Sequence, residues 1–333
     1  MKVAVVGLGG VGGYFGGRLC QNPDVDVHFL LRPTSSNVAA IRTNGLRLIS
    51  VKGDYHHPAS RCNVATAATE IGPCDYVLVC VKTYDLEALL PTLRPLVREG
   101  TAVVPLLNGM DAPTVLTEAL GKEMVLGGLC LIISYIESPG VIKHTAGSDT
   151  QLITFGELDG PCGSARVQRL KEAFHAVGVP AHVPAEEVGV LACMWEKFVK
   201  IVAFSGSTAV CRSGMGALQE QPRSAEIWLR LITEGLAVAT AHGGEVLMRD
   251  PGWLEQRHVE VRKLARDATA SMQRDIVAGR VSELHEQLGA MVRLAEAKGV
   301  DAPITAFVYA ALLPQEAEAR ARAKMVAESL PAA

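Results

Sequence analysis

Near its N-terminus the chain reads KVAVVGLGGVGGYFGG (residues 2–17), a short apolar run followed by closely spaced glycines. The chain has 32 glycines in 333 residues, and seven of them lie between Gly7 and Gly17. Glycine lets the backbone turn sharply and lets another group come close to it. The cluster therefore predicts that a ligand or another element of the fold approaches the chain at this point.

The glycines match the pattern G-x-G-x-x-G, placed directly after an apolar strand and before a helical segment, which is typical of a dinucleotide-binding turn. In that setting Gly7 permits the tight turn, Gly9 lets the backbone approach a pyrophosphate, and Gly12 allows close packing of helix on strand. The helix N-terminus would face the phosphate charge. The alternative is a packing turn without a ligand. The predicted cofactor-binding residues of the turn are Gly7, Leu8, Gly9, Gly10, Val11 and Gly12.

The end of the second strand indicates which dinucleotide binds. Strands that bind NAD end at this point in Asp or Glu, which accepts hydrogen bonds from the ribose hydroxyls. Here the strand ends in Phe29-Leu30-Leu31-Arg32. A guanidinium suits a 2′-phosphate by charge and by its two parallel donors, so Arg32 predicts NADP(H) as the cofactor. The alternative is that Arg32 lies on a solvated loop.

Two further predicted strands also end in polar residues. Lys82 follows YVLVCV, and Asn108 follows AVVPLL. Ligands of open α/β sheets gather at the carboxyl ends of the strands, so both residues are candidates for binding cofactor and substrate. The alternative for each is an exposed loop position.

The pattern of apolar runs predicts an α/β fold in the first part of the chain. Buried strands alternate with helical segments, as expected for a parallel sheet covered on both faces. The expected strands are 3–7, 27–31, 76–81, 101–107 and 125–136. An antiparallel portion is expected to follow, because residues 141–144 and 151–155 flank a polar turn.

Beyond residue 183 the strand-like runs stop and long helical patterns take over. We therefore expect an N-terminal Rossmann-type dinucleotide-binding domain over residues 1–183 and an all-helical domain over residues 184–333. The helices are expected at 185–210, 223–242, 252–278, 282–298 and 304–329.

Charge and composition exclude several classes of protein. Lys plus Arg total 32 and Asp plus Glu total 35, so no basic surplus exists to bind nucleic acid. The longest later apolar run, 125–136, is too short to span a membrane, and the glycine-rich start is a poor signal peptide, so a cytoplasmic location is expected. The eight cysteines show no C-x-x-C pair, which predicts free thiols and no metal site.

Taken in order, the motifs of this chain resemble those of the ketopantoate reductases (2-dehydropantoate 2-reductases) over nearly its whole length. The motifs that carry the resemblance are KVAVVGLGGVGGYFGG, Arg32, VKTYD with Lys82, NGM with Asn108, GVIKHTAG, WEKF with Lys197, and SMQRDI followed by Glu283.

The resemblance implies NADPH-dependent reduction of a 2-keto acid to a 2-hydroxy acid, most directly 2-dehydropantoate to pantoate in pantothenate biosynthesis. By position, Lys197 matches the catalytic lysine of the family and Glu283 its catalytic-site carboxylate. Ser271 matches a serine that contacts the substrate carboxylate. Lys82 and Asn108 match residues that contact both cofactor and substrate. A positioned lysine fits this chemistry, because hydride addition to a ketone leaves negative charge on oxygen.

The sequence departs from the family pattern one and two helical turns after Lys197. Many members have asparagine at both places, where this chain has Ile201 and Ser205. Positions i, i+4 and i+8 share one helix face, so Ser205 stays a candidate for substrate binding whereas Ile201 presents an apolar surface. A reductase of another branched or apolar 2-keto acid is therefore an alternative. A non-catalytic NADP(H)-binding regulatory protein is a second alternative, and the long helices leave a homodimer possible.

Overall fold

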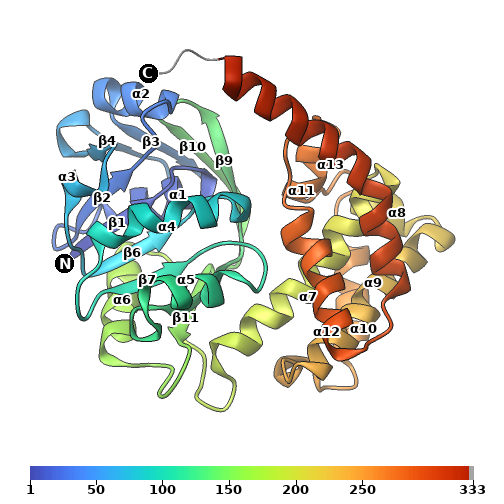
Figure 1. The fold of residues 1–333 in the computed structure, drawn as a ribbon. Coiled ribbons are helices and arrows are strands. Elements are labelled where there is room, and N and C mark those ends of the chain that lie inside the picture. The colour runs from blue at the N-terminus through green and yellow to red at the C-terminus, as the bar shows by residue number, and fades with distance from the viewer. Residues whose placement is uncertain (330–333) are drawn as a thin grey trace. The chain divides into compact units, whose positions relative to one another are not determined.

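The protein forms two compact units, Met1–Cys193 and Met194–Ala333, in a computed structural model that describes residues 1–329 (Figure 1). Helix α7 (Gly189–Cys211) begins in the first unit and continues into the second. The domain boundary expected after residue 183 precedes this helix and stays a prediction. The protein thus has the expected classes of structure in the expected order, an α/β unit followed by a helical unit.

A five-stranded parallel sheet organises the first unit, with the strand order β5-β2-β1-β6-β7. Helices occupy the connections between its strands, as in other parallel sheets, because a parallel crossover needs a long connection. The strands are β1 (Lys2–Val6), β2 (Asp26–Leu30), β5 (Asn63–Ala65), β6 (Tyr76–Val79) and β7 (Ala102–Pro105). The helices of the unit are α1 (Gly10–Leu19), α2 (Ser36–Asn44), α3 (Ala68–Ile71), α4 (Leu86–Leu93), α5 (Ala112–Leu120) and α6 (Ala165–His175).

Both faces of this sheet are buried, as the near-continuous apolar strands predicted. Along β1, Val3 and Val5 belong to one hydrophobic core, and Ala4 and Val6 belong to the other. Side chains of α1 and α6 complete the first core, and side chains of α3, α4 and α5 complete the second. The period of two along the strand therefore places alternate residues in two cores, which accounts for the apolar run from Val3 to Val6.

The antiparallel part of the first unit differs from the expectation. The predicted pairing of residues 141–144 with 151–155 is wrong, because β10 (Val141–Gly147) pairs with β9 (Ile132–Ser138) and β11 (Ile153–Glu157) pairs with β8 (Leu126–Cys130). These strands lie in two sheets, completed by β3 (Leu46–Ser50), β4 (Tyr55–His57) and β12 (Ala181–His182).

The apolar run 125–136 is accordingly two strands rather than one. Leu131 separates them, with its amide donating to the Leu152 carbonyl and its carbonyl accepting from the Ser148 amide. The chain passes from one sheet to the next at this residue. Apolarity alone predicts burial of the run, and only the pairing partners of each half decide where it divides.

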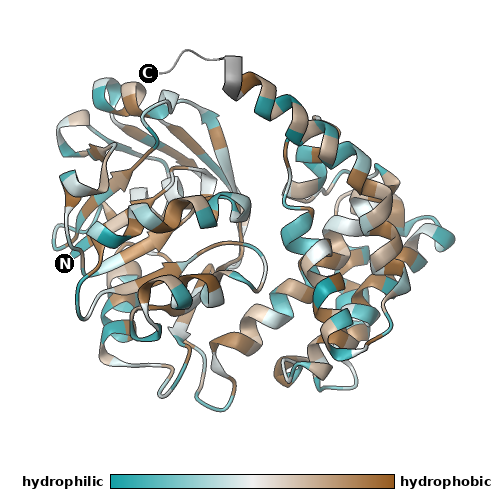
Figure 2. Cartoon of the chain, viewed as in Figure 1, coloured by the Kyte–Doolittle hydropathy of each residue, from teal (hydrophilic) through white to brown (hydrophobic). Residues whose placement is uncertain are grey.

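The second unit is helical along its described length. Its helices are α7, α8 (Met215–Gln219), α9 (Pro222–Ala241), α10 (Trp253–Arg262), α11 (Ser271–Val277), a π-helical turn η6 (His285–Gly289), α12 (Ala290–Lys298) and α13 (Pro303–Ser329). Figure 2 shows hydrophobic and hydrophilic residues mixed along α13, whose buried positions include the polar Thr305 and Glu316 as well as Val308 and Leu312.

The single helix expected over 252–278 is wrong, because α10 ends at Arg262 and α11 begins at Ser271. In the segment between them, the carbonyls of Ala265 and Arg266 accept hydrogen bonds from the amides of Gly216 and Ala217. A Cβ on Gly216 would collide with the backbone at Ala265, so the glycine permits this close approach. The helical pattern of the sequence is thus overridden by tertiary hydrogen bonds to α8.

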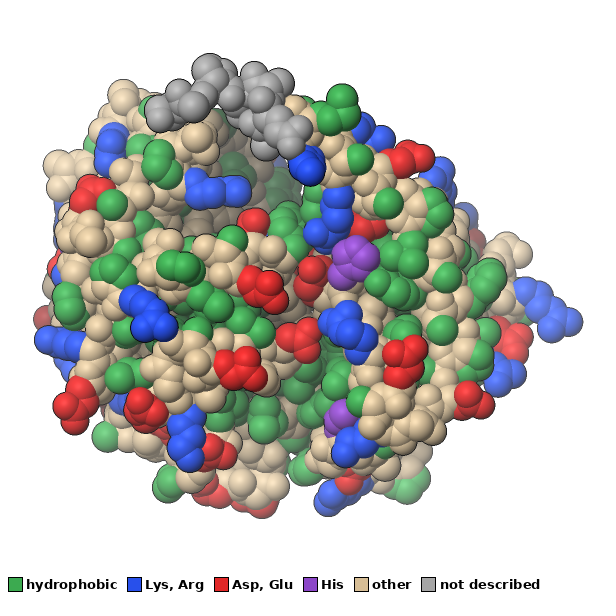
Figure 3. All heavy atoms as spheres, in the orientation of Figure 1, with side chains coloured by type: hydrophobic (Ala, Val, Ile, Leu, Met, Phe, Trp, Pro, Cys, Tyr) green, Lys and Arg blue, Asp and Glu red, His purple; other side chains and the backbone are tan. Residues whose placement is uncertain are grey.

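Surface properties agree with the charge balance of the sequence. Figure 3 shows Lys and Arg side chains interspersed with Asp and Glu on the face drawn. Among residues 1–329, no helix combines the length and the hydropathy that crossing a membrane requires.

Candidate functional site

The glycine turn joins β1 to α1 with the geometry that the motif predicts. Gly7 has φ +92°, a conformation that residues with a side chain rarely adopt. Its amide donates to the Leu30 carbonyl at 3.1 Å, which ties the turn to the end of β2. The turn therefore lies at the carboxyl edge of the parallel sheet, where the strand ends of β1 and β2 meet.

Three glycines of the turn differ in what surrounds them. A Cβ on Gly12 would collide with the Gly7 carbonyl, and one on Gly10 would collide with the backbone of Ser134 in β9. A Cβ on Gly9 would meet nothing within 4 Å. Gly10 and Gly12 are thus required by packing, whereas Gly9 borders open space at the N-terminus of α1. This open position fits a diphosphate that approaches the backbone closely.

These surroundings separate a folding requirement from a binding requirement. Gly9→Ala should leave the thermal midpoint within about 2 °C of wild type but raise the Kd for NADPH roughly tenfold, because a methyl group would occupy the open position. Gly12→Ala should lower the thermal midpoint as well, because α1 must move away from the strand. Thermal melting and cofactor titration of both variants would measure this, and a Gly9→Ala variant that binds NADPH normally would contradict it.

Arg32 lies two residues beyond β2, close to the glycine turn along the same sheet edge. Its side chain is 82% exposed, and its guanidinium lies 4.0 Å from the Asp85 carboxylate. At that distance the pair is a weak, solvent-screened interaction. The N–H groups of Arg32 thus remain available to an added anion.

Lys82 and Asn108 follow the two neighbouring strands β6 and β7. Both are half-buried, and the Thr83 hydroxyl donates to the Asn108 carbonyl at 3.0 Å. This hydrogen bond connects the loop after β6 with the loop after β7. The structure therefore brings the cofactor-binding candidates of the first unit to one edge of the sheet, at the ends of four adjacent strands, β2, β1, β6 and β7.

In the second unit, Lys197, Ile201 and Ser205 lie along one face of α7. Lys197 is half-buried, and its ammonium makes no hydrogen bond or ion pair within residues 1–329. By contrast, Lys200 pairs with Glu196 at 3.2 Å. Ser205 is fully buried, and its Oγ has no hydrogen-bond partner within the described residues. This helix face thus carries a cation and a hydroxyl that the described part of the chain does not satisfy.

Glu283 lies at the bend before the π-helical turn η6 and is 3% exposed. Its Oε2 accepts a hydrogen bond from the Gln287 side-chain amide at 3.4 Å. Nearby, burial raises the pKa of Glu286, and the Arg320 guanidinium opposes the shift while the Glu283 and Glu316 carboxylates add to it. Glu283 therefore belongs to a buried, acid-rich cluster that includes Glu286.

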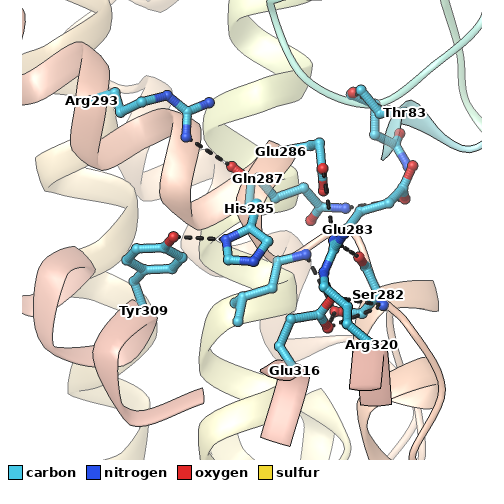
Figure 4. A network of polar contacts seen from close by, with 12 residues as sticks. Thr83, Ser282, Glu283, His285, Glu286, Gln287, Arg293, Tyr309, Glu316 and Arg320 are labelled. Atoms are coloured by element: carbon cyan, nitrogen blue, oxygen red, sulfur yellow. Dashed lines mark hydrogen bonds and ion pairs between the residues drawn. The ribbon is translucent and has the colours of Figure 1, made fainter. Parts of the chain in front are cut away.

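Ser271 is the first residue of α11 and is half-buried. It comes from a different element than Lys197 and Glu283. The second unit thus supplies its four candidates from three places, Lys197 and Ser205 from α7, Ser271 from α11 and Glu283 from the bend before η6. Two residues that the sequence analysis did not single out, Gln287 and Glu316, also belong to the Glu283 cluster (Figure 4). The i+4 spacing from Glu283 could have indicated Gln287, whereas no local signal indicates Glu316.

Within residues 1–329, no three His, Cys, Asp or Glu side chains lie together in a way that could hold a metal ion.

Comparisons with known proteins identify relatives of both units. The family model described as ketopantoate reductase PanE/ApbA matches residues 3–160, and the model of its C-terminal part matches residues 190–316. The oxidoreductase YkpB of Bacillus subtilis (strain 168), itself uncharacterized, is 30% identical over 322 residues, covering 96% of this chain and 100% of its own. The 2-dehydropantoate 2-reductase of Halobacterium salinarum is 30% identical over 306 residues, covering 91% and 95%.

A solved structure shows the same fold. The crystal structure of 2-dehydropantoate 2-reductase from Geobacter metallireducens GS-15 superposes with a TM-score of 0.84 at 28% identity, covering 94% of this chain and 99% of that one. Fold, glycine turn and relatives together define a dinucleotide-binding oxidoreductase with an α/β unit and a helical unit. Within that class, the chain belongs to the ketopantoate reductase family.

Proposed function

We propose that the protein uses NADPH to reduce a 2-keto acid to the 2-hydroxy acid, with 2-dehydropantoate as the first candidate substrate. The observation that carries the proposal is the Lys197 ammonium, which is half-buried on α7 without a partner in residues 1–329. A ketone that is being reduced develops negative charge on its oxygen, and this oxygen must then receive a proton. The Lys197 ammonium would stabilise the negative charge and donate the proton.

The glycine turn and Arg32 would hold the cofactor. The amides at the start of α1 and the open position beside Gly9 suit the diphosphate, and the exposed guanidinium of Arg32 suits the 2′-phosphate. Bound NADPH would supply the hydride for the reduction. Lys82 and Asn108, at the neighbouring strand ends, would contact both the cofactor and the substrate.

The residues of the second unit would donate the proton and bind the substrate. As the hydride adds to the carbonyl carbon, the Lys197 ammonium would donate one proton to the carbonyl oxygen, which becomes the product hydroxyl. The neutral amine would then regain a proton from water. Glu283 would accept a hydrogen bond from that hydroxyl, and the Ser271 hydroxyl would donate to the substrate carboxylate.

The identity of the side chain on the keto acid depends on Ser205 and Ile201. The buried Ser205 Oγ lacks a partner in the described residues and could bond to a substrate hydroxyl. The half-buried Ile201 favours instead an apolar, branched group at the same helix face. A reductase of a more apolar 2-keto acid is therefore the second candidate function.

One matched pair of substrates separates the two candidates. Trimethylpyruvate has a methyl group where 2-dehydropantoate has a hydroxymethyl group, so the pair differs by one hydroxyl. If Ser205 binds that hydroxyl, kcat/KM measured by NADPH oxidation should be about 10- to 100-fold higher for 2-dehydropantoate. An equal or higher value for trimethylpyruvate would favour the second candidate. Failure to reduce either compound or any other 2-keto acid would refute the proposed activity.

Three broader predictions accompany this proposal. A role in pantothenate biosynthesis depends on the substrate result. The cytoplasmic location and the homodimer stay predictions from the sequence. Sedimentation of the purified protein would measure its oligomeric state.

A further inference from the structure

Glu316 on α13 is a buried carboxylate that accepts hydrogen bonds from two other residues. It is 1% exposed, and its Oε2 accepts from the Ser282 hydroxyl at 2.6 Å and from the Ser282 amide at 3.1 Å. Its Oε1 accepts from the Arg320 Nε at 2.7 Å. A buried charge is stable only with such partners, so Glu316, Ser282 and Arg320 form one interdependent group.

Every polar group of Ser282 is engaged in this arrangement. Beyond the bonds to Glu316, its hydroxyl accepts from the Leu284 amide at 3.3 Å, and its carbonyl accepts from the Arg320 guanidinium at 3.4 Å. Ser282 itself is fully buried. Figure 4 shows Glu316 and Arg320 converging on this residue, which directly precedes Glu283. The backbone that leads into Glu283 is thereby fixed by α13.

The backbone that leaves Glu283 is fixed as well. The Gln287 amide donates to the Glu283 carbonyl at 2.9 Å, and the Gly289 amide donates to the Leu284 carbonyl at 3.0 Å. The second bond spans five residues, as in a π-helical turn, and such turns occur frequently at functional sites. The backbone on both sides of Glu283 is therefore held, on one side by the Glu316 contacts to Ser282 and on the other by the hydrogen bonds of the η6 turn.

We infer that Glu316 is a positioning residue for the reaction, acting through Ser282 to aim the Glu283 carboxylate. This inference rests on the proposed function, in which Glu283 bonds to the product hydroxyl. A carboxylate is required at position 316, because its two oxygens accept from three donors of Ser282 and Arg320. A glutamine would direct its own N–H groups at one of those donors.

The test compares Glu316→Gln, Ser282→Ala and the double variant with wild type. Glu316→Gln should lower kcat roughly tenfold with the KM for NADPH unchanged, because small displacements of a reacting group reduce turnover. Ser282→Ala should lower kcat less than Glu316→Gln does. The double variant should be no slower than Glu316→Gln alone, because both substitutions disrupt the same Glu316–Ser282 contact. Glu318→Gln is the matched control, since Glu318 is exposed on the same helix and pairs with Arg322, and its kcat should equal that of wild type.

A purely structural role for Glu316 predicts another pattern. Glu316→Gln would then lower the thermal midpoint while the folded enzyme kept its wild-type kcat, and that result would overturn the inference. Should Glu316→Gln fail to fold, a wild-type kcat in Ser282→Ala would overturn it equally. Failure of the proposed function is distinguishable, because it would appear in the wild-type protein as an absence of 2-keto acid reduction and would remove this inference with it.

Discussion

Replacing Lys197 with alanine should lower kcat for 2-keto acid reduction by about 10²- to 10⁴-fold while leaving the Kd for NADPH unchanged. The loss is expected because the reaction would then lack the donor of the proton and the charge that stabilises the developing oxyanion. The cofactor should still bind, because the glycine turn and Arg32 belong to the other unit. Stopped-flow or steady-state NADPH oxidation and a fluorescence titration of NADPH would measure the two quantities.

The chain offers a matched control for this substitution in Lys200, three residues later on the same helix. Its ammonium is occupied by Glu196, so Lys200→Ala should retain kcat within a few-fold of wild type. If Lys197→Ala kept full activity, another residue would have to donate the proton. If the wild-type protein bound NADPH but reduced no 2-keto acid, the regulatory alternative would be favoured over an enzyme.

Arg32→Ala should raise the KM for NADPH about 10- to 100-fold and change the KM for NADH little. The guanidinium is 82% exposed and held only weakly by Asp85, so it can form charge-assisted bonds with a 2′-phosphate that NADH lacks. The ratio of the two KM values therefore measures the phosphate contact separately from the rest of the cofactor.

Arg98 is the control for nonspecific loss of positive charge. It pairs with Asp75, at the amino end of β6 and hence at the opposite edge of the sheet from Arg32. Arg98→Ala should leave both KM values near wild type. Equal increases for NADPH and NADH in Arg32→Ala would refute the assignment of NADP(H).

The cofactor-binding half of the candidate site was largely predictable, because its signals are local. Gly7 and Gly12 follow an apolar strand at fixed spacing, and the structure gives them the positive φ and the close packing that the motif requires. Arg32 and Asn108 each follow a strand of one parallel sheet, so their shared edge follows from the alternation of strand and helix. The roles of these residues toward a cofactor stay predictions.

The wrong predictions of secondary structure have one physical cause, namely backbone hydrogen bonds between segments distant in sequence. The run 125–136 divides at Leu131 because its two halves pair in different sheets, and the helical pattern of 252–278 breaks because Arg266 and its neighbours bond to α8. Neither partner is encoded by the pattern of the segment itself.

The sequence by itself therefore determined the order of the two units, the glycine turn between β1 and α1 and the helix face that carries Lys197, since each depends on residues within a few positions of one another. Tertiary structure alone decided that the Lys197 ammonium is unpaired within the described residues and that Glu316 bonds to Ser282, the residue before Glu283. Burial and pairing of a charged group depend on its neighbours, which come from distant parts of the sequence. Those neighbours are brought together only by the tertiary packing of the chain.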